Sequence, residues 1–180
     1  SGAKYKKNQI ALHLDHGHSF EICKRAIDMG FSSVMFDGSK LDLDENISIS
    51  RRVADYAHKF GVSVETELGI LSGTEDKNTK SNKKQYTDPN LVKDFVKQTK
   101  TDSLAISIGT SHGAYKRKSS NESLRFDILK EIATKIPNVP LVLHGASTIP
   151  QKYIKNINKF GGDIKNAFGI SPAQIRRAIS

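Results

Sequence analysis

The sequence predicts a parallel α/β fold, in which short strands alternate with helices. Apolar runs of a few residues recur along the chain, and most are followed by a segment with helical spacing. The runs end in polar residues, among them Asp, Glu, His and Gly. Expected strand starts near residues 9, 33, 62, 102 and 140 have the spacing of successive β-α units. Because the carboxyl ends of parallel strands share one edge, the polar residues are expected to form one functional rim.

The first half of the chain contains three of the expected strands and two helices. The helical segments place apolar residues three or four positions apart, and Gly30 and Gly61 end them. Strands are expected over residues 9–14, 33–36 and 62–68, and helices over 19–29 and 44–60. In the third strand, Glu65 and Glu67 are expected on one face and Val64 on the other.

The second half begins with a polar segment, residues 69–87, which is expected to be a mobile lid or a disordered excursion. Asp88 and Pro89 then predict the cap and first turn of a helix. A second polar loop is expected over residues 109–123. The remaining expected strands cover residues 102–108 and 141–143, and the remaining helices cover 126–136, 150–160 and a segment from Ser171 onward.

Composition limits the class of protein. A chain of 180 residues with 37% hydrophobic residues is expected to form one domain, residues 1–180. No apolar run reaches the ~20 residues of a membrane span, so no membrane partner is expected. The one cysteine, Cys23, favours a reducing, cytoplasmic location. The net charge of +9 suits anionic partners, but the lysines form no stripe interleaved with aromatic residues, so no nucleic-acid partner is expected.

Three histidines share one local pattern. His16, His112 and His144 each lie where a strand gives way to a loop, and each is followed by glycine. A lone histidine at such a position is more often a structural hydrogen-bonding residue. Three with the same pattern on one rim favour a catalytic zinc site, in which three protein ligands leave a fourth position for substrate.

Four acids accompany the histidines. Asp15 precedes His16, so its side chain points the other way unless the backbone has already turned. It is a candidate proton donor or acceptor beside the metal, or a cap for the following helix. Asp37 and Glu67 end two other strands and could bind a second cation or orient the histidines. Glu75, in the polar segment, could enter the site as a base.

Five segments together resemble the class II, zinc-dependent aldolases of fructose 1,6-bisphosphate and tagatose 1,6-bisphosphate. They occur in the family's order and extend over nearly the whole chain. The segments are Ala-Leu-His-Leu-Asp-His-Gly from residue 11, Ser-Val-Met-Phe-Asp-Gly-Ser from 33, Val-Glu-Thr-Glu-Leu-Gly from 64, Ile-Gly-Thr-Ser-His-Gly-Ala-Tyr-Lys from 108 and Pro-Leu-Val-Leu-His-Gly-Ala-Ser from 140.

The resemblance implies a (β/α)8 TIM barrel and assigns roles to the matching residues. It implies that His16, His112 and His144 bind Zn²⁺. It also implies that Asp15 exchanges a proton with the aldehyde oxygen, and that Glu75 exchanges a proton with C3 of dihydroxyacetone phosphate. It places a second divalent metal at Asp37 and Glu67. The matching substrate region, with a monovalent cation (Na⁺ or K⁺), is Gly113, Lys116, Gly145 and Ser147.

The implied activity is reversible cleavage of fructose 1,6-bisphosphate, a small phosphorylated sugar, and a homo-oligomer (dimer or tetramer) is expected. Only five strands are visible, and against the family they match strands three to seven, so the barrel is expected to be incomplete. Two alternatives stay open. The substrate could be tagatose 1,6-bisphosphate, or the chain could be a zinc-binding or assembly module without turnover.

Overall fold

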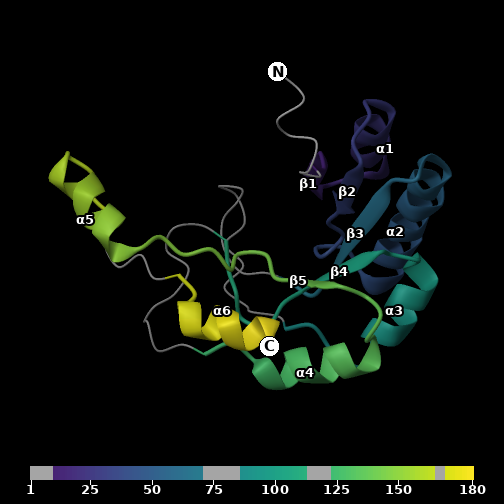
Figure 1. Ribbon diagram of the computed structural model, residues 1–180. Helices are drawn as coiled ribbons and strands as arrows, with labels where there is room; N and C mark the ends of the chain where they lie inside the picture. Colours follow the sequence, from purple (N-terminus) through teal and green to yellow (C-terminus); the bar gives the residue numbers. More distant parts are fainter. Residues whose placement is uncertain (1–9, 71–85, 113–122, 165–168) are drawn as a thin grey trace. The chain divides into compact units, whose positions relative to one another are not determined.

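The computed structural model describes residues 10–70, 86–112, 123–164 and 169–180. Five strands follow one another in the sheet in chain order: β1 (His13–Gly17), β2 (Ser33–Phe36), β3 (Ser63–Leu68), β4 (Ser103–Ile106) and β5 (Leu141–Val142). The pairs β1–β2 and β2–β3 are parallel. The predicted parallel α/β architecture is therefore confirmed, with a helix between successive strands (Figure 1).

The chain divides into two compact units, and each is described by itself. The first comprises residues 1–67 and 94–104, and the second comprises residues 68–93 and 105–180. The sequence predicts that residues 1–180 form one domain, and this stays a prediction.

In the first unit, α1 (Phe20–Asp28) and α2 (Leu43–Ala57) pack beside the strands (Figure 1). Ser19 caps α1 by accepting a hydrogen bond from the Ile22 backbone N–H, and Asp42 caps α2 in the same way at Glu45. A 3₁₀ turn, His58–Phe60, follows α2. The buried core joins both helices to the strands and comprises Cys23, Ala26, Ile27, Val34, Phe36, Val53, Ala54, Ala57, Val62 and Val64.

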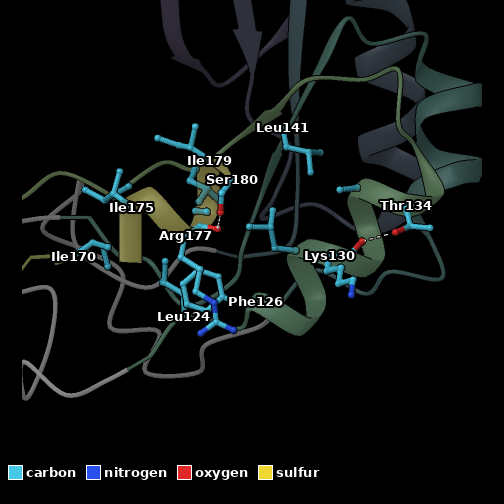
Figure 2. A pocket seen from close by; sticks show the side chains of 15 residues that line it. Leu124, Phe126, Lys130, Thr134, Leu141, Ile170, Ile175, Arg177, Ile179 and Ser180 are labelled. Carbon is cyan, nitrogen blue, oxygen red and sulfur yellow. Dashed lines mark hydrogen bonds between the residues drawn. The ribbon is translucent and has the colours of Figure 1, made fainter. Parts of the chain in front are cut away.

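The second unit contains α4 (Phe126–Lys135), α5 (Gln151–Lys159) and α6 (Pro172–Ile179), while α3 (Val92–Thr99) spans the division between the units. A mainly apolar pocket of about 1000 Å³ lies among α4, β5 and α6 (Figure 2). Arg177 and Phe126 both line the pocket. The guanidinium of Arg177 stacks over the Phe126 ring, with 4.1 Å from the guanidinium carbon to the ring centroid. Neither His112 nor His144 lines this pocket.

Two sequence predictions of element boundaries are wrong. The first strand begins at His13, not residue 9, because pairing with β2 starts at Ser33, and Ile10 is left 87% exposed. The helix expected at Asp88 begins at Val92. The Asp88 carboxylate instead accepts a hydrogen bond from the Asn90 backbone N–H, which makes a turn that competes with helix initiation.

The other expected elements are present with ends shifted by a few residues at most. The predicted polar segment 69–87 and the loop 109–123 lie largely outside the described residues. Within the part of the chain that the structure describes, no helix is long and apolar enough to cross a membrane.

Candidate metal centre

The site begins with an irregularity in β1. Leu14 pairs with Val34 and Gly17 pairs with Phe36, so Asp15 and His16 together face a single residue of β2. This is a β-bulge, which bends a strand and redirects side chains. His16 has φ of 48°, in the left-handed region that residues with a side chain seldom adopt. The backbone has therefore already turned at this position.

His16 lies against two carboxylates, one just after β2 and one in β3. Its Nδ1 is 3.0 Å from Asp37 Oδ2, just after β2, and 3.9 Å from Glu67 Oε2, in β3. The side chains of His16, Asp37 and Glu67 are 10%, 14% and 1% exposed. One nitrogen or carboxylate oxygen from each lies within 4.8 Å of the others, so the group has the donor types of a cation site.

Asp37 is held as a carboxylate by its hydrogen bonds. Its Oδ2 accepts from His16 Nδ1, and its Oδ1 accepts from the Ser39 backbone N–H at 3.0 Å and the Ser39 hydroxyl at 2.6 Å. Burial by itself would raise the pKa of Asp37, but the hydrogen bonds from His16 and Ser39 outweigh it and lower the pKa well below its usual range. An ionised Asp37 accepts only, so Nδ1 of His16 carries the proton and Nε2 is the nitrogen suited to a metal.

Asp15 lies on the same side as His16, although the two are adjacent in sequence. Its Oδ1 is 3.8 Å from His16 Nε2, and its side chain is 64% exposed. Strict strand alternation would place the two side chains on opposite faces. The bulge therefore brings an accessible carboxylate beside the nitrogen that can bind metal.

In the second unit, His112 and His144 lie next to each other, with ring centroids 6.1 Å apart. The two loops that carry them are in close contact at Gly145. A Cβ on Gly145 would lie 2.5 Å from the backbone oxygen of Ser111, and its φ of +65° favours glycine. The glycine after His144 thus permits the two histidine loops to approach.

The predicted site residues are brought together in two groups. His16, Asp15, Asp37 and Glu67 lie together in the first unit, and His112, His144 and Gly145 lie together in the second. Ser147 is exposed in the loop after β5. Glu75, Gly113 and Lys116 lie outside the described residues. The convergence of all three histidines on one zinc ion stays a prediction.

Sequence reasoning missed two supporting residues. Ser39 donates both its hydroxyl and its backbone N–H to Asp37, a local pattern that the Asp-Gly-Ser sequence could have indicated. Asn46, in the first turn of α2, donates to the backbone oxygen of Glu67 at 2.9 Å. Nothing in the spacing of Asn46 marks that contact, because it joins residues 21 positions apart.

Comparison with known proteins identifies the family of the chain. The sequence profile of the family described as "Fructose-bisphosphate aldolase class-II" matches residues 2–174. The chain belongs to this family. The resemblance read from the five segments is therefore confirmed, and the fold is that of a class II aldolase barrel, of which the described residues form five strands.

Relatives and solved structures match over nearly the whole chain. The fructose-bisphosphate aldolase of Treponema pallidum (strain Nichols) is 50% identical over 182 residues, covering 94% of this chain and 54% of that protein. The fructose-bisphosphate aldolase of Giardia intestinalis (strain ATCC 50803 / WB clone C6) is 46% identical over 177 residues, covering 98% and 54%.

Among solved structures, the YdjI aldolase of Escherichia coli K12 is 34% identical with a TM-score of 0.64, covering 94% of this chain and 53% of that one. The fructose-bisphosphate aldolase of Campylobacter jejuni is 28% identical with a TM-score of 0.59, covering 89% and 51%. The chain therefore spans about half the length of these aldolases.

Proposed function

We propose that this chain carries the metal-binding rim of an enzyme that reversibly cleaves fructose 1,6-bisphosphate to dihydroxyacetone phosphate and glyceraldehyde 3-phosphate. The arrangement of His16 between Asp37 and Glu67, beside the accessible Asp15, supports the proposal most directly. The named relatives above are fructose-bisphosphate aldolases, which favours the fructose over the tagatose substrate.

The donor set suits zinc. Imidazole nitrogen and carboxylate oxygen are both zinc ligands, and a histidine whose second nitrogen donates to a carboxylate is the usual arrangement around bound zinc. His16, His112 and His144 would hold the catalytic ion, while Asp37 and Glu67 could hold a second divalent metal. When bound, zinc withdraws electron density from the substrate carbonyl and so acidifies the neighbouring C–H bond.

The protein's own groups would move the protons. Asp15, accessible and next to His16, would take the proton of the C4 hydroxyl in cleavage and return it to the aldehyde oxygen in condensation. Glu75 would exchange the proton at C3 of dihydroxyacetone phosphate. Gly113, Lys116, Gly145 and Ser147 would bind the phosphate-bearing substrate and a Na⁺ or K⁺ ion.

The cellular location, oligomeric state and substrate class proposed for the enzyme rest on the same family membership. We infer a cytoplasmic homo-oligomer, either a dimer or a tetramer, that acts on a small phosphorylated sugar. Sedimentation velocity of the purified chain tests the oligomer directly, and a monomer at all concentrations contradicts it.

Turnover of fructose 1,6-bisphosphate by this 180-residue chain, with zinc and then with a chelator, tests the proposed function. His16→Ala should lose zinc and turnover together. His18→Ala is the matched control, since His18 is exposed and belongs to neither group of possible cation ligands found among the described residues. Turnover that survives the chelator contradicts the zinc assignment. Stoichiometric zinc without turnover supports the zinc-binding module in place of the enzyme.

A further inference from the structure

The amide of Asn46 lies buried between the ends of two strands. Asn46 is 3% exposed. Because burying an amide without hydrogen-bond partners is costly, the partners of this amide indicate its role. Nδ2 donates to the backbone oxygen of Glu67 at 2.9 Å, and Oδ1 accepts from the hydroxyl of Ser50 at 3.0 Å. Because a backbone oxygen only accepts, the orientation of the amide is fixed by these partners.

Asn46 also abuts the turn that carries Asp37. A Cβ built on Gly38 would lie 2.3 Å from Asn46 Oδ1, so the Gly38 backbone and the amide leave no room for a side chain. Gly38 follows Asp37 directly. One buried amide thus contacts the residue next to Asp37 and the main chain of Glu67 at once.

Asp37 and Glu67 are the two carboxylates that lie against His16. Their separation depends on how the end of β2 and the end of β3 are held. The ladder pairs Phe36 with Thr66, and no further pair is formed beyond it. Past that point, Asn46 connects the two strand ends through α2.

We propose that Asn46 is a positioning residue that sets the spacing of Asp37 and Glu67 around His16, and so tunes metal affinity. The proposal rests on the proposed metal-binding function of this cluster. Residues that orient metal ligands without touching the ion typically change affinity by about 10- to 100-fold when they are removed. Ser50, which is fully buried, holds the amide in turn and acts one step further away.

The competing explanation is that Asn46 only fastens α2 to the sheet. In that case its loss would lower the stability of the fold and leave metal affinity unchanged. Thr101 offers a control away from the cluster, because its buried hydroxyl lies 2.7 Å from the backbone oxygen of Ser103, in β4, and 3.0 Å from that of Val64, in β3, and so fastens the sheet at its other end. Val64 lies near the opposite end of β3 from Glu67.

The test is titration of the 180-residue chain with Co²⁺, followed by the ligand-field absorption of the bound ion, together with thermal unfolding of the metal-free protein. Asn46→Ala is expected to weaken Co²⁺ binding about 10-fold or more, Ser50→Ala less, and Thr101→Val not at all. All three should lower the unfolding temperature of the metal-free chain.

Equal Co²⁺ affinity in Asn46→Ala and Thr101→Val overturns the positioning role. If Asn46→Ala fails to fold, Ser50→Ala and Gly38→Ala carry the test, since each disturbs the amide from a different side. Absence of Co²⁺ binding by the unmodified chain removes the proposed metal site as well. Normal binding by the unmodified chain and by the variants alike removes only the role of Asn46.

Discussion

Replacing Gly145 with alanine should destabilise the loop that carries His144. Gly145 has φ of +65°, and an added Cβ would meet the Ser111 backbone oxygen at 2.5 Å and the Ser111 nitrogen at 3.0 Å. Both neighbours are main-chain atoms, so neither can rotate away. The substitution should therefore force the His112 and His144 loops apart.

Two free-energy costs contribute to the effect of Gly145→Ala, the left-handed backbone and the steric clash. A second glycine allows them to be measured separately. Gly61 has nearly the same φ, +67°, but nothing lies within 4 Å of its Cβ position. Gly61→Ala thus reports the left-handed backbone cost alone, about 1–2 kcal/mol. Gly145→Ala should add the cost of displacing packed backbone, about 1–3 kcal/mol further. The entropy that alanine removes from the unfolded chain is common to both and cancels.

Urea unfolding followed by circular dichroism measures both free energies, and the ring NMR signals of His112 and His144 report the local separation. Gly145→Ala should shift these histidine signals, and Gly61→Ala should leave them unchanged. If Gly145→Ala costs no more than Gly61→Ala, the close approach of the two histidine loops is wrong.

Three further predictions concern the first unit. Burial raises the pKa of the Cys23 thiol to about 12, so its reaction with a disulfide reagent at pH 8 should be slower by roughly 1,000-fold than in urea; a fast reaction in the folded protein would contradict its burial. The pKa of Asp37 is lowered from 3.8, so its contribution to stability is complete above that value and is lost as the pH falls further. Unfolding free energies between about pH 5 and pH 2 should therefore fall more steeply in the unmodified chain than in Asp37→Asn, and parallel curves would count against the hydrogen-bonded carboxylate. Ser19→Ala removes the cap of α1 and should cost about 1 kcal/mol in urea unfolding, whereas Ser19→Asp should retain most of the stability.

The alternation of strands and helices was predictable because it depends on local patterns. Residues 33–36 were correctly expected as a strand, since a short apolar run bounded by Gly30 and the Asp-Gly turn is typical of a buried strand. Helices begin after Ser19 and Ser171 as expected, and the cap of α1 is Ser19 itself, not Asp15. One boundary error arose where strand pairing decides the end, and the other where the Asp88 side chain forms a turn that competes with the helix. The strand β1 could not be placed until its partner Ser33 was known.

The candidate site was predictable in its residue types and less so in its arrangement. Strand-end position led to His16, Asp37 and Glu67, which do lie together. The supporting contacts of Asn46 could not be derived, because they join α2 to the ends of β2 and β3 across long sequence separations. Such contacts depend on how a helix packs on a sheet, and no local pattern records that geometry.

The bulge in β1 shows most clearly what sequence alternation cannot reveal. A regular strand would separate Asp15 and His16, and only one of them could face the carboxylates of β2 and β3. One extra residue, together with φ of 48° at His16, places both on the same side. Such a backbone conformation costs about 1–3 kcal/mol and persists only where surrounding contacts hold it. The hydrogen bond from His16 to Asp37 is one such contact, and Gly17 provides another, because a Cβ there would lie 2.8 Å from the Met35 oxygen. The Asp-His-Gly sequence therefore acts as a unit: glycine permits close strand approach, histidine takes the strained position, and the aspartate carboxylate comes to lie beside His16 Nε2.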